Sequence, residues 1–209
     1  IRLHYAYPTD FPDEVIEVMA RQKKICRYLD IPFQHISDNQ LSLMKRRHTK
    51  ADALRLIEKL RASIPDIALR TTLLVGYPGE TEEDFTELME FVRDTKFDRL
   101  GVFPYSEEEG TYSATRLKDD VPEDVKTRRL TEIIDLQNRL SEESNKRDVG
   151  KEFEILVECT SKRSEEQLSG RTSQNKMVVF DRHDFKVGDY VKVRITGCSS
   201  ATLFGEVVE

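Results

Sequence analysis

Short apolar runs alternate with amphipathic helical segments over the first 148 residues, and this alternation constrains the fold more than any other feature of the sequence. Four of the runs predict strands, at residues 1–7, 28–34, 67–75 and 100–105. Strands separated by helices of about 10–15 residues are typical of a parallel βα array, either an open doubly wound sheet or part of a βα barrel. Four strands are too few to close an eight-stranded barrel, so we predict part of one.

Polar residues predict where the helices of this region begin. Ser37, Thr49 and Thr81 each precede a helical segment and are N-cap candidates. The first two are followed three residues later by a side chain that completes a capping-box pattern. Residues 119–148 form one long helical stretch with Pro122 near its first turn. We interpret this stretch as a packing or domain-joining helix.

The pattern changes after Gly150, where apolar and polar residues alternate and no helix is predicted. Five short strands are expected, at residues 153–157, 167–172, 177–180, 191–195 and 203–208. About 60 residues of this kind read as a small antiparallel β-barrel of the oligonucleotide-binding type. The sequence therefore predicts two domains, residues 1–148 and residues 149–209.

The charges give only a weak indication of a nucleic-acid partner. The 33 Lys and Arg against 39 Asp and Glu give a net charge of −6, which does not indicate a nucleic-acid-binding chain as a whole. Within the predicted barrel, a basic face requires clustering of particular cations. The candidate RNA-binding residues are Lys162, Arg163, Arg171, Lys176, Lys192 and Arg194.

The three cysteines, Cys26, Cys159 and Cys198, are far apart, and their odd number argues against a disulfide framework. None has the spacing of a local zinc or iron–sulfur motif, so we expect no metal site within this chain. A reducing cytoplasm is the expected location. No apolar run approaches the roughly 20 residues that span a bilayer, and no basic-then-apolar leader is present, so we expect no membrane partner.

The residues at the carboxyl ends of the predicted strands are the candidate ligand-binding residues, because ligands of parallel βα arrays gather there. Gln34, Ser37 and Tyr105 could hydrogen-bond a ribose or an amino-acid group, and Gly76 and Gly79 permit close backbone approach to a flat ligand. A simple turn with a helix cap explains the glycines and Ser37 equally well.

Three further features of the sequence bear on ligand binding or catalysis. His35 is a candidate acid–base group, although the sequence fixes no carboxylate beside it. The basic run at residues 45–48 suits either a phosphate or carboxylate ligand or a solvated face. Arg70 lies in an otherwise apolar strand and, if its side chain points inward, is expected to need an anionic partner. Residue chemistry alone gives no reaction, because no nucleotide-binding, zinc-protease, hydrolase or kinase motif is present.

Four segments resemble the radical-SAM methylthiotransferases. They are residues 2–8 (RLHYAYP), 28–35 (YLDIPFQH), 69–85 (LRTTLLVGYPGETEEDF) and 105–111 (YSEEEGT). Residues 155–158, 161–164 and 168–172 resemble the TRAM domain of that family, a small RNA-binding β-barrel. The resemblance covers essentially the whole chain.

The resemblance implies a partial (β/α) barrel that binds S-adenosylmethionine on a 4Fe–4S cluster. Reductive cleavage would yield a 5′-deoxyadenosyl radical that abstracts hydrogen from an unactivated C–H bond, after which sulfur and a methyl group are installed. The cofactor carries that chemistry and the protein orients it. By position, the implied S-adenosylmethionine contacts are Gln34, Ser37, Val75, Gly76, Tyr77, Pro104, Tyr105 and Ser106.

The two parts of the chain resemble branches of the family with different substrates. The βα segments are most similar to the branch that modifies an aspartate of a small-subunit ribosomal protein, which is the expected activity. The TRAM segments are closer to the branch that modifies isopentenyl-adenosine in tRNA, which is the alternative. A non-catalytic RNA-binding module, in which the βα part only presents the barrel, is a third hypothesis.

The chain departs from the family because it lacks the C-x-x-x-C-x-x-C cluster motif and the domain that holds a second cluster. We therefore expect a C-terminal part of a longer enzyme, with the cluster ligands outside this chain. Such a part is expected to be inactive alone and to have the remainder of the same protein as a partner.

Overall fold

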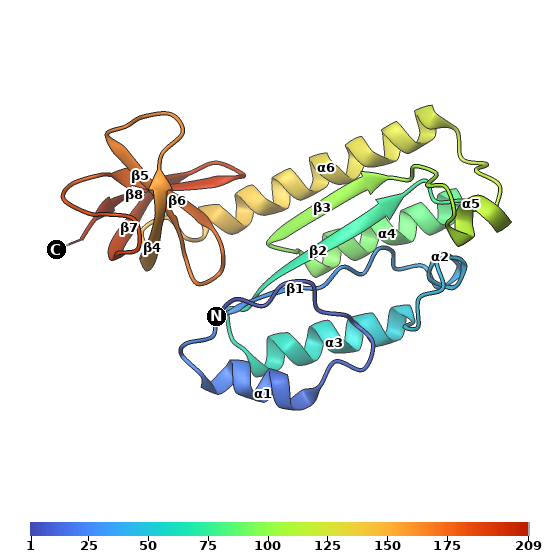
Figure 1. Cartoon of the computed structure of the whole chain (residues 1–209), viewed down its shortest axis with the longest axis horizontal. Coiled ribbons are helices and arrows are strands. Elements are labelled where there is room, and N and C mark those ends of the chain that lie inside the picture. The colour runs from blue at the N-terminus through green and yellow to red at the C-terminus, as the bar shows by residue number, and fades with distance from the viewer. Residues whose placement is uncertain (209) are drawn as a thin grey trace.

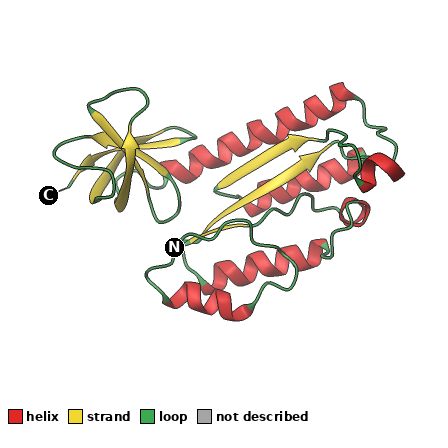
Figure 2. Ribbon diagram, viewed as in Figure 1, coloured by secondary structure: helices red, strands yellow, loops and turns green. Residues whose placement is uncertain are grey.

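The computed structural model describes residues 1–208 and contains a parallel sheet covered by helices, followed by a barrel of strands alone (Figures 1 and 2). The first part comprises α1 (Asp13–Arg21), β1 (Tyr28–Asp30), α2 (Asp38–Leu43), α3 (Lys50–Ser63), β2 (Ala68–Val75), α4 (Glu82–Thr95), β3 (Arg99–Pro104), α5 (Tyr112–Arg116) and α6 (Glu123–Lys146). The barrel comprises β4 (Glu152–Thr160), β5 (Gln167–Arg171), β6 (Met177–Asp181), β7 (Tyr190–Cys198) and β8 (Thr202–Val207).

The sheet has the order β1-β2-β3, and all of its pairs are parallel, as the alternation of strands and helices predicts. The expected strand at residues 1–7 is wrong. Only Leu3 makes an isolated parallel bridge, to Leu29, because Tyr5 adopts a left-handed backbone with φ of 57° that ends the extended run. The expected strand at residues 28–34 shortens to β1, since Pro32 has no N–H to donate to a ladder.

Two of the three predicted N-caps form as the sequence indicates. Thr49 and Thr81 each accept a bond from the backbone three residues on and complete capping boxes with Asp52 and Asp84. Ser37 stands at the N-cap of α2 without a side-chain cap bond, so the expected box there is wrong. Its hydroxyl is engaged by a tertiary contact described below.

The main core lies between the sheet and its helices. Along β2, Leu69, Leu73 and Val75 are buried toward the helices, whereas Thr72 and Leu74 on the opposite face are only half-buried. This alternation gives the sheet one core face and one more open face. We call the second of these, formed by residues 70, 72 and 74 with their neighbours 99, 101 and 103, the open face.

The barrel closes in the order β4-β5-β6-β8-β7 around an apolar core that includes Val157, Phe180 and Val193. Among the described residues its strand pairs are antiparallel except β6–β8, which is parallel, so the antiparallel expectation needs that correction. At Gly170 a Cβ would clash with the backbone of Leu156, which explains why only glycine fits this crossing.

Candidate cofactor edge and nucleic-acid interface

The turn after β2 is held by the buried carboxylate of Glu80. This carboxylate accepts a bond from the backbone N–H of Gly76 and pairs with the guanidinium of Arg129 on α6, with 2.7 Å between Nη1 and Oε2. His35 Nε2 lies 3.1 Å from Glu80 Oε1, and His35 Nδ1 accepts from the backbone N–H of Ser37 at 3.0 Å. Because Nδ1 accepts, the proton belongs on Nε2, which donates to Glu80. The imidazole is wholly buried with both nitrogens engaged, so it holds this edge together instead of facing a ligand.

The Ser37 hydroxyl donates to Asp84 on α4, which explains its absence from the cap of α2. The other carboxylate oxygen of Asp84 accepts from Asn39 Nδ2 at 2.8 Å and from the backbone of Thr81 at 3.0 Å. Burial raises the pKa of Asp84, but the bonds from Ser37, Thr81 and Asn39 lower it more, and the net pKa lies below its usual range. Asp84 is therefore a carboxylate that joins two βα loops.

Most of the side chains expected to contact S-adenosylmethionine point into the protein. Val75 and Ser37 are buried, and Tyr77 and Tyr105 are buried edge to face, with ring centroids 5.1 Å apart. The N–H of Gly76 is already bonded to Glu80. These residues shape the edge, so any direct contact by them would have to use backbone atoms.

Three of the expected contacts remain available to a ligand. Pro104 and Ser106 are exposed, and Gln34 is half-buried. Gln34 lies beside β2, since its N–H donates to Thr72 O at 2.9 Å and its carbonyl accepts from Leu74 N at 2.8 Å. The structure thus brings Gln34 to the sheet edge, as the sequence predicts.

The sequence reasoning missed the open face beside Gln34. Phe103, opposite Leu74 in the β2–β3 register, has 57% of its surface exposed, and Gly101 adds no side chain between Phe103 and Arg70. A flat apolar surface beside an amide and a hydroxyl suits a ligand with an aromatic ring and polar ends. The alternation along residues 69–75 is the sequence signal that could have revealed this face.

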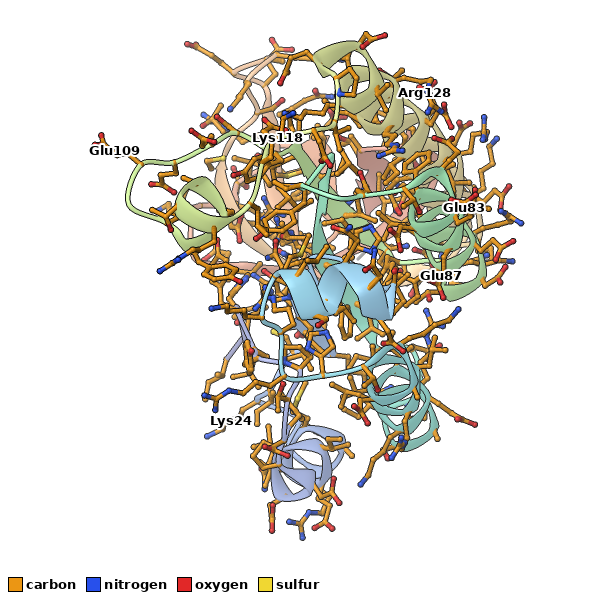
Figure 3. All side chains as sticks on the ribbon, turned by 90° about the vertical axis from the view of Figure 1, so that its right-hand side faces the viewer. Lys24, Glu83, Glu87, Glu109, Lys118 and Arg128 are labelled. Atoms are coloured by element: carbon orange, nitrogen blue, oxygen red, sulfur yellow. The ribbon has the colours of Figure 1, made fainter. Side chains whose placement is uncertain are left out.

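Figure 3 views the molecule from this edge, with α2 in front and the labelled Glu83, Glu87 and Arg128 at the periphery of α4 and α6. Glu87 pairs with Lys50 at 2.6 Å, and Arg128 pairs with Glu82 at 2.8 Å. Two of these labelled charged side chains, Glu87 and Arg128, are thus in ion pairs.

An iron–sulfur cluster does not fit the cysteines of this chain. Cys26, Cys159 and Cys198 lie on separate elements, and Cys159 Sγ is 3.1 Å from Ser169 Oγ in the barrel. Within residues 1–208, no group of three or more His, Cys, Asp and Glu side chains is placed to hold a metal ion. A cluster needs thiolates that converge on one centre, so its ligands are not among the described residues.

The basic run at residues 45–48 does not form one face. Lys45 Nζ lies 3.3 Å from the ring centroid of Tyr112, and the Arg46 guanidinium lies 5.7 Å from that of Tyr7. His48 is buried instead, packed edge to face on Phe33 with centroids 6.1 Å apart.

We expect His48 to make folding sensitive to mild acid. Burial, and secondarily the nearby Arg46, lowers the pKa of its imidazole below the usual value near 6.5. In the unfolded chain the ring takes up a proton near pH 6.5, whereas in the folded chain it does so only at lower pH. The free energy of unfolding should therefore fall as the pH drops below about 6.5. We expect His48→Phe to reduce this loss when urea unfolding is compared at about pH 7.5 and about pH 5.5. An identical loss in both proteins would contradict the prediction.

The predicted RNA-binding cations of the barrel divide into three groups. Lys162 and Arg163 are exposed in the loop after β4. Lys192 and Arg194 on β7 both pair with Glu152 at 2.7 Å, and Arg171 pairs with Glu158 at 3.0 Å. These residues remain candidates for contact with phosphates.

Lys176 does not join a basic surface. It is only 8% exposed, and its Nζ lies 2.6 Å from Asp148 Oδ2 and 3.0 Å from Ser144 Oγ at the end of α6. Its charge is neutralised between the barrel and the helix. By contrast, Arg70 lies on the open face and still has an anionic partner, since Arg70 Nη1 lies 2.7 Å from Asp30 Oδ2.

No helix in the described part of the chain has both the length and the apolar character needed to cross a membrane.

Comparison with known proteins assigns both parts of the chain. Residues 1–92 match the Radical SAM superfamily and residues 146–208 match the TRAM domain. Among solved structures, coproporphyrinogen III oxidase (HemN) from Escherichia coli covers 83% of this chain and 46% of its own, with a TM-score of 0.56 at 15% identity. The archaeal Elp3 of Methanocaldococcus infernus covers 95% of this chain and 57% of its own, with a TM-score of 0.50 at 13% identity. At these identities the likeness concerns the fold alone.

Curated relatives match the whole chain. A tRNA-2-methylthio-N(6)-dimethylallyladenosine synthase of Porphyromonas gingivalis is 52% identical over 209 residues, and one of Phocaeicola vulgatus is 50% identical over 208. The ribosomal protein uS12 methylthiotransferase RimO of Phocaeicola vulgatus is 43% identical over 215 residues. The chain spans about half the length of these relatives, between 45% and 49%. The chain therefore carries a radical-SAM segment and a TRAM domain, and its whole length is homologous to part of the tRNA and ribosomal-protein methylthiotransferases.

Proposed function

We propose that the protein containing this chain transfers a methylthio group to N6-dimethylallyladenosine in tRNA. The observation that carries the proposal is the identity of 52% to a tRNA methylthiotransferase across both the sheet and the barrel. Identity to the ribosomal-protein enzyme is lower, at 43% over the same chain. From the sequence alone, the ribosomal protein is the expected substrate and tRNA is the alternative. Because identity to the tRNA enzyme is higher than identity to the ribosomal-protein enzyme, we propose tRNA as the first candidate substrate.

The aspartate of a small-subunit ribosomal protein remains the second candidate substrate. It is supported by the 43% identity to the ribosomal-protein enzyme and by the resemblance of residues 28–35 and 69–85 to that branch. A non-catalytic RNA-binding module is the third possibility, since the barrel could serve without the chemistry.

S-adenosylmethionine, when bound on a 4Fe–4S cluster, supplies the radical that removes hydrogen from an unactivated carbon. We assign its contacts within this chain to Gln34, Gly76 through its backbone, Pro104 and Ser106, with Phe103 as a flat neighbour. Glu80 and Asp84 act by holding the loops that carry these residues. We assign the ligands of the cluster to a segment outside residues 1–208. We also propose that the boundary between the two domains lies at residues 148–149.

The test is a methylthiolation assay on the longer protein, reconstituted anaerobically with iron and sulfide. Both substrates are offered in parallel: tRNA carrying N6-dimethylallyladenosine, and the ribosomal protein uS12. Methylthiolation of the tRNA supports the proposal. Modification of uS12 alone establishes the second candidate, and RNA binding without either product establishes the third.

Gln34→Ala in the longer protein should weaken S-adenosylmethionine binding about threefold to tenfold. Losing one hydrogen bond of the amide costs about 0.5–1.5 kcal/mol, which corresponds to that change in affinity. The backbone of Gln34 has φ of 70°, and alanine bears the same cost there as glutamine, so the melting temperature should be unchanged. Isothermal calorimetry and thermal unfolding of the same variant check both values. A lowered melting temperature with unchanged affinity would remove Gln34 from the site.

A further inference from the structure

The candidate cofactor residues lie at the carboxyl ends of β2 and β3, and we call this end of the sheet the cofactor edge. The barrel is attached to the sheet by specific contacts at the opposite end. In Figure 1 the strands β2 and β3 point toward α5, whereas the barrel lies beyond their starting ends. Arg99, the first residue of β3, donates to Ser200 O at 2.7 Å and to Ala201 O at 2.8 Å. Arg27, just before β1, donates its N–H to Ser173 Oγ at 3.1 Å. The two parts therefore share a defined seam.

A cavity of about 360 Å³ lies at this seam, on the open face of the sheet. Its walls include the guanidinium-bearing residues Arg70, Arg99 and Arg171, and Tyr28 and Asp30 of β1 also line it. Arg171 comes from the barrel and the other four from the sheet. Its volume is at the lower end of the range for ligand pockets, about 300–1,000 Å³.

Two polar atoms of residues lining this cavity lack hydrogen bonds. The hydroxyl of Tyr28 has Asn175 as a polar neighbour but makes no hydrogen bond of standard geometry among residues 1–208, and Oδ1 of Asp30 makes none either; both atoms are buried. Both residues are only 1% exposed. A buried polar atom without a partner is unfavourable, so such atoms mark a place where a ligand can supply the missing bonds.

The charges of the cavity favour an anion. Three guanidiniums line it, whereas the carboxylate that lines it, Asp30, has only Oδ2 paired, to Arg70 at 2.7 Å. Arg171 also bonds Asn175 within the same wall, through Nη1 and the side-chain oxygen at 3.2 Å. An anionic group beside a hydroxyl that both donates and accepts is the chemistry of a ribose phosphate.

We propose that the seam cavity binds a ribose-phosphate unit of an RNA, with the phosphate at the guanidiniums and the ribose 2′-hydroxyl at Asp30 Oδ1 and Tyr28. The inference rests on the proposed function in that the substrate is an RNA. The cavity lies about 17 Å from the cofactor edge, at about 3.3 Å for each of the five residues from Arg70 to Val75. The bound unit is therefore several nucleotides away from the adenosine that reacts.

Binding of two short single-stranded probes of the same sequence, one RNA and one DNA, tests the cavity in this chain by fluorescence anisotropy. Tyr28→Phe removes only the hydroxyl, so RNA affinity should fall about threefold to tenfold while DNA affinity stays the same. Arg171→Gln should weaken both probes and reduce the slope of log affinity against log salt by about 0.7. Arg128→Gln on α6 is the matched control, because it too removes an ion-paired guanidinium, and neither probe should be affected.

Thermal unfolding of each variant separates loss of fold from loss of contact. If Tyr28→Phe weakens both probes equally, or neither, the assignment of the 2′-hydroxyl is overturned. If Arg171→Gln behaves like Arg128→Gln, the cavity is not the phosphate site. Either result leaves the proposed activity standing, because that is decided by methylthiolation of tRNA in the longer protein.

Discussion

Replacing Glu80 with Gln is expected to lower the free energy of unfolding by about 3–5 kcal/mol, the usual cost of breaking a buried ion pair from one side. The carboxylate of Glu80 is fully buried, and the Arg129 guanidinium beside it is only 4% exposed. The variant leaves that guanidinium with only the more exposed carboxylate of Glu82 as a charged partner, at 3.1 Å, and weakens the bonds to Gly76 and His35. Urea unfolding followed by circular dichroism measures the change.

Glu87→Gln is the matched control for this variant. Glu87 on α4 also pairs with a cation, Lys50, but both side chains are substantially exposed, at 31% and 40%. Exposed pairs contribute about 0–1 kcal/mol, so the control should remain within that range. A loss in Glu80→Gln no larger than in Glu87→Gln would mean that the turn does not depend on the buried pair.

Lys176→Met is expected to lower the free energy of unfolding by about 3 kcal/mol and to loosen the barrel from α6. The variant removes the cation that lies 2.6 Å from Asp148, where both side chains are largely buried. Lys151 Nζ, 3.3 Å from the other oxygen of Asp148, compensates in part, which places the loss at the lower end of the usual range. Urea unfolding gives the loss, and limited proteolysis near residues 147–151 reports on the seam.

Lys192→Met serves as the control for the seam, since Lys192 is also a barrel cation paired with a carboxylate but is 61% exposed. We expect a change of no more than about 1 kcal/mol and no new cleavage. Equal losses for Lys176→Met and Lys192→Met would show that the buried pair does not hold the two parts together.

Local sequence signals predicted the elements whose causes are local. The N-caps at Thr49 and Thr81 and the capping box at Thr49 depend on residues at most three positions apart, and all form as expected; the structure adds a second box at Thr81. The five barrel strands follow from alternation within each strand, and all five are present. The parallel pairing of β6 with β8 could not be read in this way, because it depends on how the barrel closes.

The candidate site was predicted less completely because its contacts join residues distant in sequence. The cap pattern at Ser37 is real in sequence, but Asp84, 47 residues away, takes the hydroxyl. In the same way, the sequence around Lys176 is that of a surface cation, but the fold places its ammonium beside Asp148, 28 residues earlier in the chain. No single-residue pattern distinguishes a free hydroxyl or ammonium from one that a partner elsewhere in the fold engages.

The strand-end rule gives the end of the sheet where the candidate cofactor residues lie, but it does not give which of their side chains are accessible. Tyr77 and Tyr105 follow their strands directly, yet both turn into the protein and pack on each other. Phe103, one residue inside the end of β3, is the aromatic side chain left exposed there. Alternation along the strand, read together with the strand end, distinguishes these two outcomes.

Mass spectrometry of tRNA nucleosides from cells that lack the gene encoding this chain tests most directly whether tRNA is the substrate. We predict that the 2-methylthio group disappears from N6-dimethylallyladenosine, that the unmethylthiolated nucleoside accumulates, and that the intact gene restores the modification. An unchanged tRNA nucleoside, together with loss of the methylthio group from the aspartate of uS12, would contradict the assignment.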